Sequence, residues 1–458
     1  MAASSQTSIK MKQDRAAVFF FAVVGVALFF WVWRYGPTWP WDDSYGFLRY
    51  RDWLISGERN AWDIVKARSN EHLIAFHLSV ALATLELSGF YMKALIYENA
   101  VLLLAGGMLV WLSLRQTLTA ATFPILFAFV IAISILNPSQ MAYLLWEFQI
   151  WWYLDLAMFA ATIFLVERFG FRFYPAVLLF CLLGTGSEAQ GAFLWLSTGV
   201  HLFLLMARAA DRSARIRGLV ALVSHMFLFL LAAWLLMHGE SNEVGHIKAS
   251  QSLLSHLSYF VKLVGGGFGN QDESVALAFG SVSLMLWVAF TANAARRMFD
   301  TTESRVALLL TGMPLLWTIA FAIGRESFGA AWALGDFHQA PMLMTFFMGI
   351  AVYALELASK IPKARLSAFA VVLFSVLPIA TGAKWGYERS VYVRVKSNLA
   401  AAANCSGAPI DRKNMLRLIG LDNFGYVYDS TLHYVGQLCS HQPDVQGWVA
   451  DMQANLQQ

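Results

Sequence analysis

Charged residues are scarce in this sequence of 458 residues. Asp, Glu, Lys and Arg make up only 14% of it and 58% of the residues are hydrophobic, whereas a typical soluble domain is about 25% charged. The runs 94–114 and 218–237 are almost entirely apolar, and about 20 such residues are enough to cross a hydrocarbon core of ~30 Å. A large soluble helical protein would need a continuous polar face on each helix, which these runs lack. The composition therefore indicates an integral membrane protein.

Motifs for bound metals and nucleotides are missing as well. Neither a His-x-x-x-His nor a Cys-x-x-Cys pair occurs, and the glycine-rich run 265–270 lacks the lysine of a phosphate-binding loop. We interpret that run as a flexible hinge. No cofactor and no dedicated metal site are expected, although a metal requirement stays open. The net charge is only +4, with most of the basic excess in short loops, which indicates membrane topology rather than nucleic-acid binding.

The N-terminal segment has the features of a retained first span. Lys10, Lys12 and Arg15 precede an apolar stretch, and tryptophans rather than a small-x-small cleavage site follow it. Tryptophan is enriched at membrane interfaces. We therefore expect an uncleaved helix that ends in an aromatic belt.

Apolar runs and basic loops together predict eleven spans, or twelve if 73–92 also crosses. The predicted spans are 16–34, 94–114, 121–136, 149–166, 173–187, 189–207, 218–237, 276–294, 305–323, 341–358 and 364–382. Lys and Arg resist translocation in short loops. With a cytoplasmic N-terminus and 73–92 juxtamembrane or re-entrant, the basic clusters after 114, 166, 207, 294 and 358 all fall inside. The sequence thus predicts an all-α polytopic membrane protein.

The same topology places the long polar segments outside. They are 35–72, 238–275 and 324–340 within a transmembrane domain of residues 1–382, followed by a small extracytoplasmic C-terminal tail, 383–458. Residues 45–55 and 251–264 have amphipathic patterns typical of juxtamembrane helices lying in the interface. In the second, Leu253, Leu254 and Leu257 share one side, and His256, Tyr259 and Lys262 lie opposite.

The tail contains two of only three cysteines. Cys405 and Cys439 would lie in an oxidising compartment, where a disulfide is plausible. Spacing alone does not fix a bond, so two unpaired thiols remain the alternative. Cys181 lies within a predicted span and is expected to be a small core residue.

Several ionisable residues lie at the predicted outer membrane boundary. Asp42 and Asp43 follow the first span in a Trp-rich segment, where partial desolvation would raise a carboxylate pKa toward the range of a general base. Ordinary solvated loop carboxylates are the alternative. Further candidates, each of which alone could be an interfacial anchor, are Glu71, His72, Glu147, Gln149, Arg325, Glu326, Asp336 and His338. Their convergence on one side favours a functional site.

Four segments carry a resemblance to a known family. They are WDDSYG at 41–46, SNEHLIAFH at 69–77, NPSQMAYLLWEFQIWW at 137–152 and IGRESFGAAWALGDFHQAP at 323–341. In order and spacing they resemble the GT-C superfamily of integral membrane glycosyltransferases, which take sugars from polyprenyl-phosphate carriers. Leu73 stands where a basic residue is common, and GDFHQ replaces a Ser-Arg-Tyr-like run. These departures concern the identity of sugar and acceptor.

The resemblance implies roles for the candidate residues. Asp42, or Asp43 in its place, would be the base that activates an acceptor hydroxyl. Arg325, with His338, would bind the leaving phosphate. The residues that would bind sugar or acceptor hydroxyls are Glu71, His72, Glu147 and Gln149.

The implied reaction is inverting transfer of a sugar from a polyprenyl-phosphate carrier to a glycan, glycolipid or protein acceptor. It would take place on the periplasmic or exterior face of a bacterial inner membrane. A lipid-linked oligosaccharide polymerase or ligase is one alternative, but it would place its Arg and His in a large late loop. A transporter or flippase is another. It would need polar residues near mid-membrane, for which Glu98, Asp155 and His225 are candidates, and an internal repeat, which we do not find.

Overall fold

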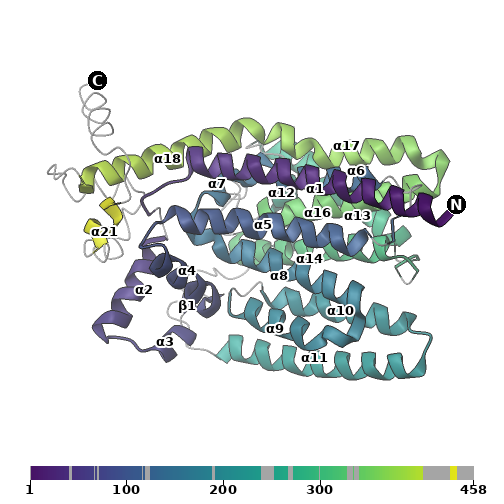
Figure 1. The fold of residues 1–458 in the computed structure, drawn as a ribbon, viewed down its shortest axis with the longest axis horizontal. Helices are drawn as coiled ribbons and strands as arrows, with labels where there is room; N and C mark the ends of the chain where they lie inside the picture. Colours follow the sequence, from purple (N-terminus) through teal and green to yellow (C-terminus); the bar gives the residue numbers. More distant parts are fainter. Residues whose placement is uncertain are drawn as a thin grey trace.

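The fold is a bundle of long helices whose axes lie roughly along a common line, with the chain passing back and forth (Figure 1). The structure is a computed structural model. It describes the chain apart from residues 1, 41–43, 67, 70–71, 116, 119–123, 188–190, 239–251, 267–271, 295, 299, 327–333, 335–339, 406–433 and 441–458.

Eleven helices coincide with the eleven predicted spans. They are α1 (Ala2–Tyr35), α5 (Lys93–Leu114), α6 (Pro124–Ile135), α8 (Ile150–Phe169), α9 (Tyr174–Thr185), α10 (Ala192–Arg208), α11 (Arg212–His238), α13 (Glu273–Ala294), α14 (Thr302–Arg325), α16 (Ala340–Lys360) and α17 (Arg365–Thr381). By length and composition, nine stretches of the described residues could cross a membrane, with α8 and α9 counted together and α10 just too short. The prediction of an all-α polytopic membrane protein is confirmed.

Shorter elements connect the spans. Those toward one end of the bundle are α2 (Tyr45–Ser56), α3 (Ala61–Val65), β1 (Arg68–Ser69), β2 (His72–Leu73), α4 (Ala75–Leu87), η3 (Pro138–Gln140), α7 (Met141–Leu144), η4 (Glu147–Gln149), α12 (Leu253–Gly266), α18 (Ala383–Cys405) and α21 (Val435–Ser440). Two short turns, η5 (Gly170–Phe173) and η8 (Pro362–Ala364), follow α8 and α16. We call the end with α2, α3, α4 and α21 the loop end, and the opposite one the N-terminal end (Figure 1).

The segment 73–92 does not contain a full span. Its helix, α4, has 13 residues, and unlike the short helices α6 and α9 it does not belong to one of the described stretches that are long and apolar enough to cross a membrane. Because α4 lies at the loop end (Figure 1), the chain leaves α1 and enters α5 on the same side. This agrees with the count of eleven rather than twelve.

The basic clusters gather at the N-terminal end. Arg115, after α5, forms an ion pair with Asp14 of α1 at 3.2 Å. At the end of α16, Lys360 pairs with Glu356, and the same carboxylate accepts a hydrogen bond from Thr301 before α14. Contacts between residues so distant in sequence place the turns after α5, α13 and α16 at one end, as the basic-loop pattern predicts.

The helix α12 differs from its predicted orientation. Tyr259, expected on the water-facing side, is buried and packs with Leu263 against Phe321 of α14. Its polar side therefore faces protein, whereas Leu253 and Leu254 are strongly exposed. The hinge prediction also fails for the first glycine of 265–270, because a Cβ on Gly265 would lie 1.8 Å from the Ala276 carbonyl oxygen of α13. That glycine allows a close helix crossing.

The start of the predicted tail is a helix continuous with the bundle. α18 follows α17 directly and lies beside α1 (Figure 1), where Trp31 Nε1 donates to Ser390 Oγ at 3.3 Å. Ser397 Oγ donates to the Trp39 carbonyl at 3.0 Å and accepts from its N–H at 3.2 Å. These bonds fix the chain that leaves α1 against α18.

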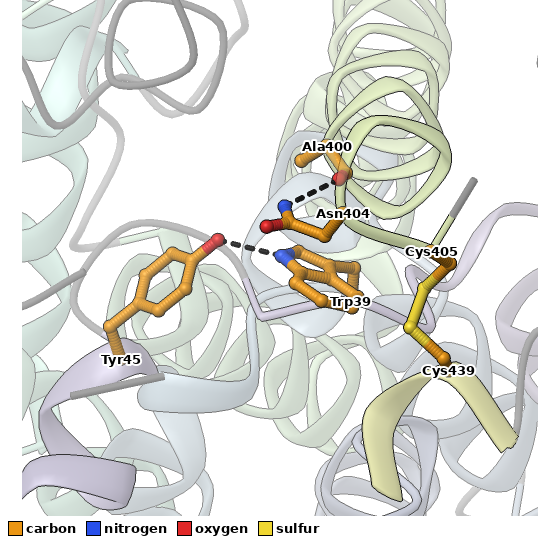
Figure 2. The surroundings of a disulfide bond; sticks show 6 residues. All are labelled: Trp39, Tyr45, Ala400, Asn404, Cys405 and Cys439. Carbon is orange, nitrogen blue, oxygen red and sulfur yellow. Dashed lines mark hydrogen bonds between the residues drawn. A yellow bond between two sulfur atoms is a disulfide. The ribbon is translucent and has the colours of Figure 1, made fainter. Parts of the chain in front are cut away.

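The predicted disulfide is present. Cys405, at the end of α18, is bonded to Cys439 of α21, with 5.5 Å between the two Cα atoms (Figure 2). Cys181 is a free, buried cysteine, as expected. The disulfide attaches the short helix α21 to the loop end of the bundle.

Thiol labelling tests this bond. In native membranes without reductant, we expect a maleimide to modify none of the three cysteines, because two are bonded and Cys181 is buried. After mild reduction, Cys405 and Cys439 should both react. Mass spectrometry of the labelled peptides identifies the sites, and labelling of either residue before reduction would contradict the disulfide.

Candidate functional site

Two of the segments singled out in the sequence meet at the loop end. Ser44, which follows Asp43 in the sequence, donates from Oγ to Glu147 Oε2 at 2.9 Å. Ser44 Oγ also accepts a hydrogen bond from the backbone N–H of Phe148 at 3.2 Å. Ser44 and Glu147 are both fully buried. A residue of the WDDSYG segment is thus fixed to the WEFQ turn, although about 100 residues separate them.

The WEFQ turn is held by α5. The buried Asn99 donates from Nδ2 to the carbonyl oxygens of Leu144 and Trp146, each at 3.3 Å. Gln149 is also buried, and its Oε1 accepts from Trp151 Nε1 at 3.2 Å. The structure therefore places the predicted Glu147 and Gln149 inside the protein, where they bond to protein groups.

A third segment packs on the same turn. His77, at the end of SNEHLIAFH, is buried, and its Nδ1 lies 2.7 Å from the Ser187 carbonyl oxygen between α9 and α10. Its ring contacts those of Phe148 and Trp151, with centroids 6.1 and 5.6 Å apart. His77 belongs to one of the four quoted segments, but a single histidine in an apolar run did not indicate a role from the sequence alone.

The end of α14 lies on the same side of the molecule. Trp152 of α8 and Trp317 of α14 are in contact, with ring centroids 4.0 Å apart. Arg325 follows Trp317 by roughly eight residues, or about 12 Å of helix, and Glu147 precedes Trp152 on an antiparallel neighbour. Both therefore lie beyond this contact, toward the loop end. Arg325 is half-buried, and the next residue, Glu326, is buried.

Five candidate residues lie outside the described part of the chain: Asp42, Asp43, Glu71, Asp336 and His338. His72 is described as part of β2, where it pairs with Ser69 of β1. Of the predicted set, the structure thus locates Glu147 and Gln149 in one turn and Arg325 at the end of α14. Within the part of the chain that is described, no three His, Cys, Asp or Glu side chains are grouped to hold a metal ion.

A cluster around Arg51 joins α2 to the C-terminal segment. Its guanidinium bonds to Glu86 of α4 and donates to the Tyr434 hydroxyl at 2.9 Å, and it lies 4.4 Å from the centroid of the Phe90 ring. Burial acts to lower the pKa of Arg51, but hydrogen bonds with Glu86 and Tyr434 outweigh it and raise that pKa. Burial and a hydrogen bond to Asp52 raise the pKa of Tyr434 to about 12. Arg51 therefore keeps its charge, and the cluster fixes the residue that precedes α21 to α2.

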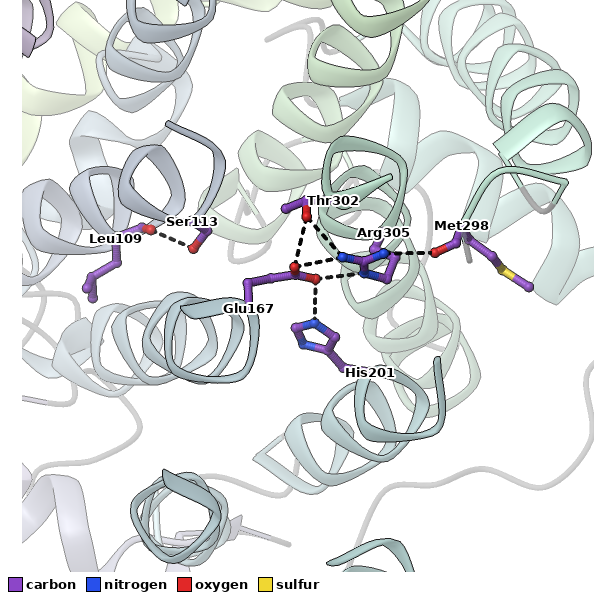
Figure 3. Close-up of polar contacts among 7 residues, drawn as sticks. All are labelled: Leu109, Ser113, Glu167, His201, Met298, Thr302 and Arg305. Carbon is purple, nitrogen blue, oxygen red and sulfur yellow. Dashed lines mark hydrogen bonds and ion pairs between the residues drawn. The ribbon is translucent and has the colours of Figure 1, made fainter. Parts of the chain in front are cut away.

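A second charged cluster joins residues of α8, α10 and α14 (Figure 3). Glu167 of α8 receives two hydrogen bonds from Arg305 of α14, each 2.8 Å long. Its Oε1 is also 2.8 Å from His201 Nε2 of α10, and its Oε2 accepts from Thr302 at 3.1 Å. The side chains of Glu167, Arg305 and His201 are at most 4% exposed. This network connects α8, α10 and α14. None of its three charged residues stood out as a candidate in the sequence.

Two of the three polar residues considered for a transporter have contacts to a neighbouring helix. Glu98 accepts from Thr84 at 2.8 Å, joining α5 to α4, and His225 Nε2 lies 2.8 Å from the Trp195 carbonyl oxygen of α10. Asp155 is buried in α8. The contacts of Glu98 and His225 connect neighbouring helices, which favours a role in packing for these two residues.

Comparison with known protein families, curated proteins and solved structures gave no match.

Proposed function

We propose that the chain is an inverting glycosyltransferase that moves a sugar from a polyprenyl-phosphate carrier to the hydroxyl of a glycan, lipid or protein acceptor at the loop end. The main support is the hydrogen bond between Ser44 and Glu147. It joins the segment of the Asp42–Asp43 pair to the WEFQ turn at the end of the bundle where α14 also brings Arg325. Described residues of three of the quoted segments, namely Ser44, His77 and the WEFQ turn, are thus in contact or linked through that turn, and Arg325 of the fourth lies at the same end of the bundle.

In the proposed reaction, the carboxylate of Asp42, or of Asp43 in its place, takes the proton of the acceptor hydroxyl. The acceptor oxygen bonds to the anomeric carbon as the bond from that carbon to the phosphate oxygen breaks. The electron pair leaves with the polyprenyl phosphate, and attack from the opposite face inverts the anomeric centre. Arg325 would neutralise the charge on the leaving phosphate, because a guanidinium binds phosphate oxygens with two donors.

For Glu147 and Gln149 the structure favours positioning over direct sugar contact. Both are buried, and their side chains bond to Ser44 and Trp151. Glu71 and His72 remain candidates for binding sugar or acceptor hydroxyls. In this proposal, the buried carboxylate of Glu147 holds Ser44 and thereby positions the segment that carries the base.

Release of polyprenyl phosphate tests the function. Purified protein in lipid is incubated with polyprenyl-phospho-sugars that differ in the sugar, together with a membrane extract as acceptor source. We expect one donor to release polyprenyl phosphate and to label an acceptor. If every donor remains intact in the presence of folded protein, the proposal is wrong. Transport or polymerisation by the same protein would then support one of the alternative functions.

The loop end is proposed to face the periplasm of a bacterial inner membrane. The disulfide supports this, because disulfides persist in oxidising compartments. Reporter fusions at Arg212 and Arg296 should then report cytoplasm, and a fusion after Leu399 should report the exterior. Phosphatase and fluorescent-protein reporters at each position give opposite signals. A cytoplasmic signal after Leu399 would reverse the orientation and move the proposed site to the other face.

A further inference from the structure

A polar cavity lies between α12 and the end of α14. Its volume is about 380 Å³, within the range of ~300–1,000 Å³ of small-molecule sites. The polar residues that line it are Ser252, Ser255, Ser258, Tyr259, Lys262 and Glu326. Neither the resemblance nor the proposed reaction gives these residues a role.

Glu326 is the unusual member of this lining. The residue is only 8% exposed, and its Oε1 accepts from Ser255. Its Oε2 has no hydrogen-bond partner among the described residues. A buried acceptor without a donor is costly, and native proteins seldom leave one unpaired. A ligand hydroxyl in the cavity would provide the missing donor.

The charges of the cavity select against an anionic ligand. Lys262 Nζ is 2.7 Å from Glu273 Oε2 of α13, so the lysine charge is already compensated. Glu326 is the single carboxylate among the lining residues, and the ion pair of the lining lysine is with a residue outside the lining. Together with the hydroxyls of Ser255 and Ser258, Glu326 suits neutral groups that donate and accept hydrogen bonds. The hydroxyls of sugars and polyols can donate to this carboxylate and accept from the serines. The charged oxygens of a phosphate only accept hydrogen bonds, so they offer the carboxylate no donor.

The rim of the cavity is apolar and faces outward. Leu254 lines the cavity and is 74% exposed, and Leu253 and Leu257 on the same helix are exposed as well. The helix is closely fitted to α13, since a Cβ on Gly280 would lie 2.0 Å from the Val261 carbonyl oxygen. The leucine rim and most of the polar wall thus belong to one helix that is packed closely against α13. Such a rim suits an acyl or prenyl tail attached to the bound group.

We propose that this cavity binds the hydroxyl-rich headgroup, a sugar or a polyol, of a bilayer lipid. Glu326 accepts a ligand hydroxyl, and the leucines of α12 contact the lipid tail. This inference goes beyond the proposed transfer reaction and is measured by binding without any donor, so the two can fail separately.

Cysteine protection tests the proposal. The native cysteines should not react, because Cys181 is buried and the others are bonded, so Ser258→Cys introduces a single reactive thiol. The full chain is placed in phosphatidylcholine nanodiscs, and its maleimide labelling rate is measured with octyl glucoside below its micelle-forming concentration. We expect octyl glucoside to slow labelling. Tetraethylene glycol monooctyl ether, with the same tail and one hydroxyl, should not slow it.

Glu326→Gln in the same background should raise the half-protecting concentration of octyl glucoside about fivefold to tenfold, because a charge-assisted hydrogen bond becomes a neutral one. Glu58→Gln, at an exposed carboxylate, is the matched control and should change nothing. Ser252→Cys, at the exposed rim, replaces Ser258→Cys if the latter does not fold. If octyl glucoside and tetraethylene glycol monooctyl ether protect equally, the cavity does not recognise the headgroup. If octyl glucoside protects neither the Ser258→Cys nor the Ser252→Cys variant, the proposed site is wrong. Protection by free glucose at the same concentration would overturn the lipid-borne ligand.

Discussion

Replacing Asp42 with Asn should leave the protein folded and inserted but lower the rate of sugar transfer by about 10²–10⁴-fold, the usual contribution of a general base. The amide is nearly isosteric with the carboxylate but cannot take the proton of the acceptor hydroxyl. Initial rates of polyprenyl phosphate release at saturating donor measure the effect. Recovery of monodisperse protein with a native disulfide verifies the fold.

Asp43→Asn is the matched variant, because the two carboxylates are neighbours. If Asp43→Asn alone is inactive, the base is Asp43 and the rest of the mechanism stands. If each variant keeps most of its activity, both are solvated loop carboxylates and the proposed mechanism fails.

Arg325 gives a separate measurement of the same reaction. Arg325→Ala should lower kcat and also weaken donor binding, because the guanidinium is proposed to contact the phosphate of the donor. Arg325→Lys should recover only part of the loss, since a point charge replaces a two-donor fork. If Arg325 only anchors the end of α14 at the membrane interface, both variants should have near-normal kcat and near-normal KM for the donor.

The spans were predictable because each depends on local composition. An apolar run of span length has few other stable environments, and basic residues in short loops indicate which helix ends share a side. The ion pair of Arg115 with Asp14 and the bonds of Glu356 place those ends together. Helix α12 was harder, because its amphipathic pattern does not distinguish a polar side that faces water from one that faces protein. Its polar side lines a cavity beside Glu326.

The sequence could suggest candidate residues for a site but not their contacts. The order of WDDSYG, WEFQ and GRESFG suggested a common site, yet only the fold shows that Ser44 bonds to Glu147. Burial also separates residues that look alike in sequence. Gln149 and Glu147 are enclosed by protein, whereas Arg325 is half-buried. Such differences depend on which helices pack together, and single-sequence patterns do not contain that information.

The network around Glu167 was missed for a related reason. Glu167 lies beside Arg168, in a span end that resembles a solvated interfacial turn, and its partners Arg305 and His201 are far away in sequence. In the structure these three side chains are almost completely buried and bonded to one another. A charged residue at the end of a span can thus either anchor the helix in the headgroup region or form a buried ion pair with a neighbouring helix. Only the partners distinguish the two.

Glu167→Ala should accordingly lower the free energy of unfolding by about 3–5 kcal/mol, because it leaves the buried guanidinium of Arg305 without its carboxylate. The matched control is Asp14→Ala. It removes the partner of Arg115 from a pair that is 35% and 37% exposed, so the cost there should be about 0–1 kcal/mol. Unfolding in mixed micelles, followed by tryptophan fluorescence, measures both. Glu167→Gln with Arg305→Met removes both charges and should recover part of the loss. A cost for Glu167→Ala no larger than that for Asp14→Ala would show that the network does not hold α8, α10 and α14 together.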